Sequence, residues 1–121
     1  MGAYGADIFD DDVAMDVRAT FDEALEEGVS VRAATKHTLN TYLEYLDDPD
    51  DGPIVWLALA TLQLEHGELQ ARVCHEALAV IAAGDHLGRW EEASEELLVE
   101  RRRVLDGLQA RLEAASTTSK P

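Results

Sequence analysis

The sequence predicts an all-α fold, organised as a single-domain bundle of about five helices. Apolar residues recur at spacings of three and four, and glycine and proline fall between the periodic stretches. No convincing strand pattern interrupts this helical periodicity. A chain of 121 residues, of which 46% are hydrophobic, is long enough for one domain with one core.

The first helix is predicted over residues 12–27. Its core face repeats every four residues, through Val13, Val17, Phe21 and Leu25. Gly28 suits a left-handed C-terminal cap, and Asp10 or Asp11 can accept hydrogen bonds from the first free N–H groups. Residues 1–11 are expected to form an ordered arm in front of this helix.

A second helix is predicted over residues 30–46, with Ser30 as its N-terminal cap. Helical spacing gives it a buried stripe that comprises Ala34, Thr38, Leu39, Tyr42, Leu43 and Leu46. The polar segment DDPDDGP then separates it from the third helix, and either Asp51 or Gly52 is expected to cap that third helix.

The third helix contains the segment IVWLALATLQL, which has almost no polar face and is therefore predicted to be central and buried. Pro53 suits its first turn, and Gly67 ends the pattern. A fourth helix follows over residues 68–83. The two helices predict an antiparallel hairpin that resembles one tetratricopeptide unit, without a second copy to make an array.

The last helix is predicted over residues 94–115, after a connection that ends at the apolar anchor Trp90. Its stripe comprises Leu97, Leu98, Val104, Leu105, Leu108 and Leu112. Trp90 and this stripe cover either the core of the same chain or a symmetric partner, so that homo-oligomerisation stays open. The domain is expected to span residues 1–115, and residues 116–121 are expected to be a disordered tail.

Five segments carry a resemblance to a known family. MGAYG, FDDD, GPIVWLALATLQ, HGEL and GDHLGRW occur in this order, and together they resemble the bacterial family called domain of unknown function 4259. Its members begin Met-Gly-Ala-Trp-Gly and continue to Phe-Asp-Asn-Asp, so Tyr4 replaces one aromatic by another and Asp11 stands near the usual asparagine. The resemblance covers residues 1 to about 112 and implies no reaction, cofactor or partner.

Negative charge is the main compositional feature. The formal net charge is −15, from 25 acidic and 10 basic residues. Such a charge argues against binding of nucleic acid or of an anionic membrane surface. Residues 1–52 carry 14 of the acids and three of the basic side chains. A basic partner is therefore expected to approach the N-terminal half.

Two metal sites can be weighed from the sequence, and no cofactor is expected. DDPDDG places Asp47 and Asp51 at calcium-loop positions, but Pro49 and Ala58 stand where two further ligands are required. A zinc site in the hairpin is disfavoured because His66 and Cys74 are separated by about 10 Å of helix rise. A buried Cys74 and exposed histidines are expected instead.

Few residues in the rest of the sequence point to a chemical function. Cys74 is the only cysteine, and no apolar signal segment opens the chain, so a cytoplasmic location is expected. The basic run at residues 101–103 is flanked by acids. It is expected to form surface pairs such as Glu100 with Arg103 and Arg102 with Asp106, although a contact with the acidic N-terminal half is an alternative.

The function expected from these features is a non-enzymatic protein-interaction module. An immunity protein or antitoxin-like neutraliser of a basic partner is one concrete form of it. The candidate partner-binding acids are Asp10, Asp11, Asp12, Asp16, Asp22, Glu23, Glu26 and Glu27. The alternative is a small-ligand-binding or enzymatic domain with a pocket between helices. Its lining would be the aromatics Tyr42, Tyr45, Trp56 and Trp90, which otherwise belong to the core.

Overall fold

The structure is a computed structural model that describes residues 5–84 and 87–118. The chain is all-α over these residues, as predicted. It forms seven helices there, namely α1 (Asp12–Glu26), α2 (Val31–Thr41), α3 (Leu43–Leu46), α4 (Asp51–Glu65), α5 (Ala71–Ala83), α6 (Gly88–Ala93) and α7 (Glu95–Thr118). Of the predicted arm, residues 1–4 lie outside the described part of the chain.

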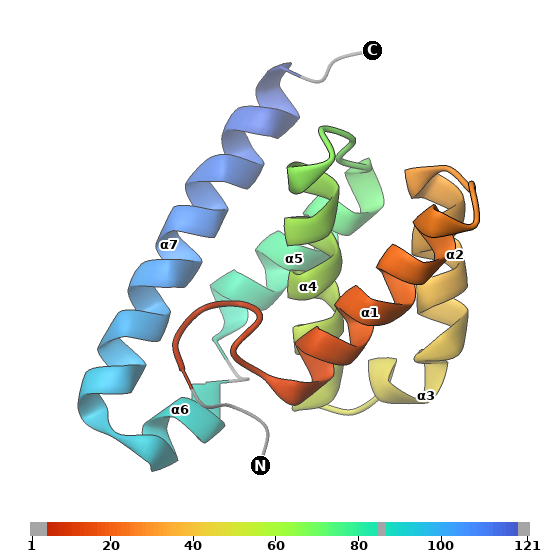
Figure 1. Cartoon of the computed structure of the whole chain (residues 1–121). Helices are drawn as coiled ribbons and strands as arrows, with labels where there is room; N and C mark the ends of the chain where they lie inside the picture. The colour runs from red at the N-terminus through yellow and green to blue at the C-terminus, as the bar shows by residue number, and fades with distance from the viewer. Residues whose placement is uncertain (1–4, 85–86, 119–121) are drawn as a thin grey trace.

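Helix α4 is the centre of the bundle. Every residue from Ile54 to Gln63 is buried, which confirms the prediction made from its all-round apolar sequence. Figure 1 shows α1 and α2 on one side of α4, and α5 and α7 on the other. The helices that pack most extensively against α4 are α1, α3, α5 and α7. Consecutive long helices run in opposite directions, so α4 and α5 form the predicted antiparallel hairpin.

Side-chain caps begin the first two long helices. Asp11 Oδ1 accepts from the backbone N–H groups of Val13 at 2.8 Å and Ala14 at 3.3 Å. Ser30 Oγ accepts from the N–H of Ala33 at 3.1 Å. Both caps were predicted, with Asp10 as the other candidate for the first. Gly28 ends the first hairpin turn with a φ of +96°, in the left-handed region that was expected for it.

The cap of α4 differs from the prediction. Asp48 Oδ1 accepts from the N–H groups of Asp50 at 2.7 Å and Asp51 at 2.9 Å, so neither Asp51 nor Gly52 supplies the cap. The Asp48 carboxylate folds the acidic turn back on itself and satisfies donors that the helix start leaves open. Because the Asp48 carboxylate is bound to these backbone N–H groups, the acidic segment has the contacts of a structural turn.

The predicted helix over residues 30–46 is wrong in one respect, because it breaks at Tyr42. The backbone there has φ −106° and ψ 28°, outside the helical range. The Tyr42 hydroxyl donates to the carbonyl oxygen of Asp16 at 2.9 Å and lies 2.8 Å from Thr20 Oγ1, so the side chain is tied to α1. After the break α3 has a new direction, and Leu43 is 61% exposed rather than part of the core stripe.

The C-terminal part also departs from the predicted boundaries. The connection before the last helix contains a short helix of its own, α6, which holds Trp90. Helix α7 continues to Thr118, so the prediction of a disordered tail is wrong for residues 116–118, and the rest of that tail, residues 119–121, lies outside the described chain. The α7 residues Leu105, Leu108 and Leu112 are buried against the core of the same chain.

Trp90 and Arg101 hold the N-terminal arm against the bundle. Trp90 Nε1 donates to the carbonyl of Gly5 at 2.9 Å, and Arg101 Nη1 donates to the carbonyls of Ala6 at 3.1 Å and Asp7 at 3.2 Å. The guanidinium carbon of Arg101 lies 4.0 Å from the centroid of the Trp90 ring, and both side chains are fully buried. The arm, α6 and α7 therefore form one packed unit.

Within the described ranges, no helix is both long enough and apolar enough to cross a bilayer.

Candidate functional site

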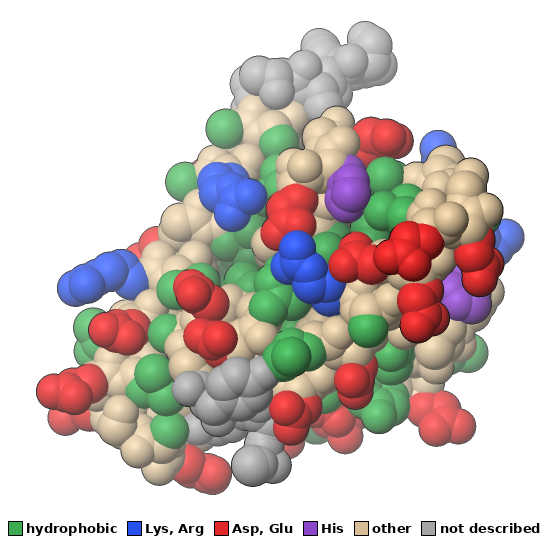
Figure 2. All heavy atoms as spheres, in the orientation of Figure 1, with side chains coloured by type: hydrophobic (Ala, Val, Ile, Leu, Met, Phe, Trp, Pro, Cys, Tyr) green, Lys and Arg blue, Asp and Glu red, His purple; other side chains and the backbone are tan. Residues whose placement is uncertain are grey.

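Five acidic side chains form one continuous face of α1, here called the acidic face. Its members are Asp12, Asp16, Glu23, Glu26 and Glu27, which caps the end of the helix, and all five are exposed. Because helix positions advance by about 100° per residue, the five lie within an arc of roughly 100° around the axis. In Figure 2 acidic side chains gather over the region where α1 runs.

The other three predicted partner-binding acids do not belong to this face. The prediction is wrong for Asp11, which is fully buried because its carboxylate caps α1. Asp10 is half-buried, and its Oδ2 accepts from the N–H of Asp7 at 3.3 Å within the arm. Asp22 lies beside the acidic face and forms an ion pair with Arg18, with 3.8 Å between Nε and Oδ2.

Arg18 does not neutralise the acidic face. Its Nη2 donates to Glu65 Oε1 at 2.9 Å, which joins α1 to the end of α4. Its guanidinium carbon also lies 4.5 Å from the centroid of the Phe9 ring. These contacts hold the Arg18 side chain on the side of α1 where Asp22 and Glu65 contact it. Arg18 is the only basic residue in α1, so the acidic face has no counter-charge on its own helix.

The acidic face includes the helix end at which negative charge is unfavourable. Glu23, Glu26 and the cap residue Glu27 are near the C-terminus of α1, and no basic residue occupies its last turn. The unpaired carbonyl groups of a helix end carry partial negative charge, which repels carboxylates nearby. The acids at this end therefore oppose the helix dipole, whereas Asp12, in the first turn, is favoured by it.

The four aromatics considered for a pocket do not line a common one. Trp90 is buried against the arm, whereas Trp56 borders a hollow between α4 and α5. Tyr42 packs against Tyr45 with 5.5 Å between ring centroids, in an edge-on arrangement. Trp56 and Trp90 belong to the core, while Tyr45 is 37% exposed.

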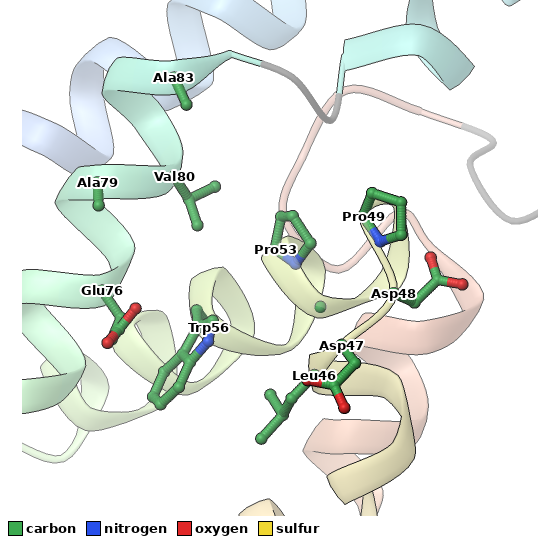
Figure 3. Close-up of a pocket in the computed structure, with 11 residues that line it drawn as sticks. Leu46, Asp47, Asp48, Pro49, Pro53, Trp56, Glu76, Ala79, Val80 and Ala83 are labelled. Carbon is green, nitrogen blue, oxygen red and sulfur yellow. The ribbon is translucent and has the colours of Figure 1, made fainter.

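The hollow beside Trp56 measures about 350 Å³ and lies between the start of α4, the second half of α5 and the turn that precedes α4. Val80, Ala83 and Pro53 give it an apolar wall (Figure 3). The carboxylates of Asp48 and Glu76 lie on opposite sides of it. No pair of carboxylates converges there on a point where a reacting group would sit, and Asp48 is already bound to backbone N–H groups.

The candidate metal ligands are also kept apart. Cys74 is buried, whereas His66 and His75 are exposed, as expected. No group of three or more metal-binding side chains occurs among the described residues. Burial raises the pKa of the Cys74 thiol; a hydrogen bond with Ser116 lowers it, and the nearby Glu113 carboxylate raises it further. Such a thiol stays protonated near neutral pH.

The run at residues 101–103 has a different role from the surface pairs that were expected. Neither Glu100 with Arg103 nor Arg102 with Asp106 forms an ion pair, since the pairs between described residues both use Arg18. Arg101 takes the alternative, intramolecular role, and it binds backbone carbonyls of the arm. The signal for its burial was its position four residues before Leu105, on the apolar stripe of α7.

A buried amide cluster was missed altogether. Gln63 is fully buried, and its Nε2 donates to Thr35 Oγ1 and to Gln70 Oε1, both at 2.8 Å. Its Oε1 accepts from the N–H of Gln70 at 2.8 Å. One polar side chain thereby connects α4, α2 and the start of α5. Its place inside a helix without a polar face was the available signal that it is buried and bonded.

Comparisons with known proteins add no assignment. Family models, curated proteins and solved structures each gave no match to the chain. The resemblance to domain of unknown function 4259 therefore stays a prediction from the order of its motifs.

Proposed function

We propose that the chain is a non-enzymatic interaction module that binds a basic protein through the acidic face. The observation that carries the proposal is the arrangement of five exposed carboxylates on one face of α1 with no basic side chain among them. Charges collected on one face give a directed field, which speeds the capture of an oppositely charged surface and makes it sensitive to salt.

The position of these acids favours binding over a purely solubilising role. Acids that only keep a protein soluble can occupy any exposed position. Glu26 and Glu27 instead occupy the end of α1, where the helix dipole opposes them and no base relieves them. A basic partner that approaches this end would remove the repulsion on binding.

The proposal extends to family and location. It includes membership of the family called domain of unknown function 4259, supported by the order of the five motifs. It also places the protein in the cytoplasm, supported by its single cysteine, which is free and buried. An immunity- or antitoxin-like role is the form that best matches small size and high negative charge.

Affinity capture at two salt concentrations tests the proposal. The chain is immobilised and exposed to the proteins of its source cell at low and at high ionic strength. We expect a basic protein to be retained at low salt and released at high salt, because exposed charges are screened beyond a Debye length of about 3 Å at 1 M salt. Retention of no basic protein, or retention that salt does not change, would contradict the proposal.

A further inference from the structure

A hollow lined by basic side chains lies between α2 and the first turn of α5. It measures about 540 Å³, and three basic side chains line it: Arg32 and Lys36 from α2, and Arg72 from α5. Arg32 and Lys36 are four residues apart and so share one side of α2. Three of the ten basic residues of a chain with net charge −15 therefore meet at one place.

These three cations have no carboxylate partner in the described chain. Arg18, by contrast, forms ion pairs with two carboxylates, those of Asp22 and Glu65. The guanidinium carbon of Arg72 lies 5.2 Å from the centroid of the Trp56 ring, within the range of a cation–π contact. This contact with the indole leaves the positive charge of Arg72 unneutralised. Like charges gathered without a counter-ion repel one another, and a bound anion would relieve this repulsion.

Two helix starts border the hollow. The N-terminal residues of α2 and α5 lie at the same end of the bundle (Figure 1), and Ser30, Arg32, Gln70 and Arg72 all line the hollow. Helix starts present free N–H groups and partial positive charge. Ser30 Oγ accepts its bond from Ala33, so its own hydroxyl proton is left to donate.

The buried Gln63 orients one more donor. It binds both the Oε1 and the backbone N–H of Gln70. Because its Oε1 is bound to Gln63, the Nε2 of Gln70 is left to donate elsewhere, and Gln70 lines the hollow. The buried Gln63 thus fixes the orientation of the Gln70 amide, which lies nearer the surface.

We infer that this hollow binds the phosphate group of a small organic phosphate monoester. A doubly charged, oxygen-rich group matches three cations with hydroxyl, amide and backbone donors better than a singly charged carboxylate does. The organic part would lie against the apolar lining residues, which are Ala33, Leu39 and Val73. This site is separate from the acidic face and does not depend on the function proposed for that face.

Titration of the full-length protein with phenyl phosphate tests the inference, with NMR amide shifts as the readout and salt added to screen the long-range negative field. Saturable shifts are expected at the starts of α2 and α5. Inorganic phosphate should bind more weakly because it lacks the apolar part, and phenyl sulfate more weakly because it carries one charge. Unsaturable shifts at millimolar ligand, or equal binding of phenyl sulfate, would overturn the inference.

Two variants of equal charge separate a specific site from a general effect. R32Q/R72Q and the control R102Q/R111Q each remove two exposed arginines, so each changes the net charge from −15 to −17. R32Q/R72Q should weaken phenyl phosphate binding about tenfold or more, while the control should leave it unchanged. Equal weakening by both variants would overturn the inference. Lys36→Gln, in a protein whose spectrum is otherwise unaltered, should weaken binding in the same direction as R32Q/R72Q.

Discussion

Gly52 and Gly107 illustrate how strongly the effect of one residue depends on its surroundings. A Cβ added to Gly52 would lie 2.7 Å from the carbonyl oxygen of Leu46 and 3.0 Å from that of Tyr45. Both neighbours are backbone atoms, which cannot swing aside as the end of a side chain can. Around Gly107, inside α7, a Cβ would meet nothing within 4 Å. The first glycine is required for close packing of the turn, and the second is not.

Alanine at these two positions should therefore act in opposite directions. We expect Gly52→Ala to lower the free energy of unfolding by about 1–3 kcal/mol through the backbone shift it forces. Gly107→Ala should raise it by about 0.5–1 kcal/mol, because alanine loses less conformational freedom in a helix than glycine does. Urea unfolding measures both, and a Gly52→Ala protein as stable as the parent would contradict the contact with Leu46.

Cys74 gives a prediction about pH. Since burial raises the thiol pKa in the folded state above its ordinary value of 9.0, the unfolded chain releases this proton first as the pH rises. The contribution of the thiol to stability is complete below about pH 9 and is lost as the pH rises through the folded-state pKa. Stability should thus fall more steeply in alkaline solution for the parent than for Cys74→Ala.

The measurement is urea unfolding of both proteins at neutral and at alkaline pH. Reaction of the folded parent with a thiol reagent should also be much slower than reaction of the urea-unfolded chain, since Cys74 is buried. If the stabilities of parent and variant changed with pH in the same way, and the folded thiol were labelled fast, the thiol would be exposed and its pKa would not be raised.

Helix α1 combines two opposed electrostatic ends. Asp11 and Asp12 favour its start, through a capping bond and through the dipole. Glu26 and Glu27 at its end have no such support. The helix is held chiefly by its other side, where Val17 and Phe21 are fully buried. Burial therefore fixes the helix, and its exposed face is free to carry charge that is locally unfavourable.

Removal of the two terminal charges should stabilise the protein. We expect Glu26→Gln and Glu27→Gln each to raise the free energy of unfolding by about 0.3–1 kcal/mol at low salt, and less at high salt. Glu68→Gln, which removes an exposed charge from a loop, provides the control and should have little effect. If the two helix-end variants lose stability instead, their carboxylates make favourable contacts and do not oppose the dipole.

The sequence predicted elements better than it predicted the residues that join them. The core helices follow from apolar periodicity, which depends only on local spacing. The break at Tyr42 depends on bonds to Asp16 and Thr20 in another helix, and the burial of Arg101 depends on Trp90 and on the arm. Asp11 was correctly expected as a cap, but the same role removed it from the predicted binding surface.

At the scale of the whole molecule, charge is sorted by position. The acidic face occupies the outer side of α1, while the three cations of the hollow lie between α2 and α5. The sequence predicted the acidic N-terminal half from counting alone. It did not predict the basic hollow, because Arg72 is far from Arg32 and Lys36 along the chain and only the packing of α2 and α5 around Gln63 brings them together.

The central claim is that the acidic face, and not the total charge, binds a basic partner. Two triple variants of equal net charge, −12, test it most directly: Asp16→Asn with Glu23→Gln and Glu27→Gln on the face, and Glu44→Gln with Glu68→Gln and Glu92→Gln at exposed positions elsewhere. The measurement is the affinity of each for the captured partner at low salt. We expect the face variant to bind about tenfold or more weakly and the other to bind like the parent. Equal affinities of the two variants would contradict the claim.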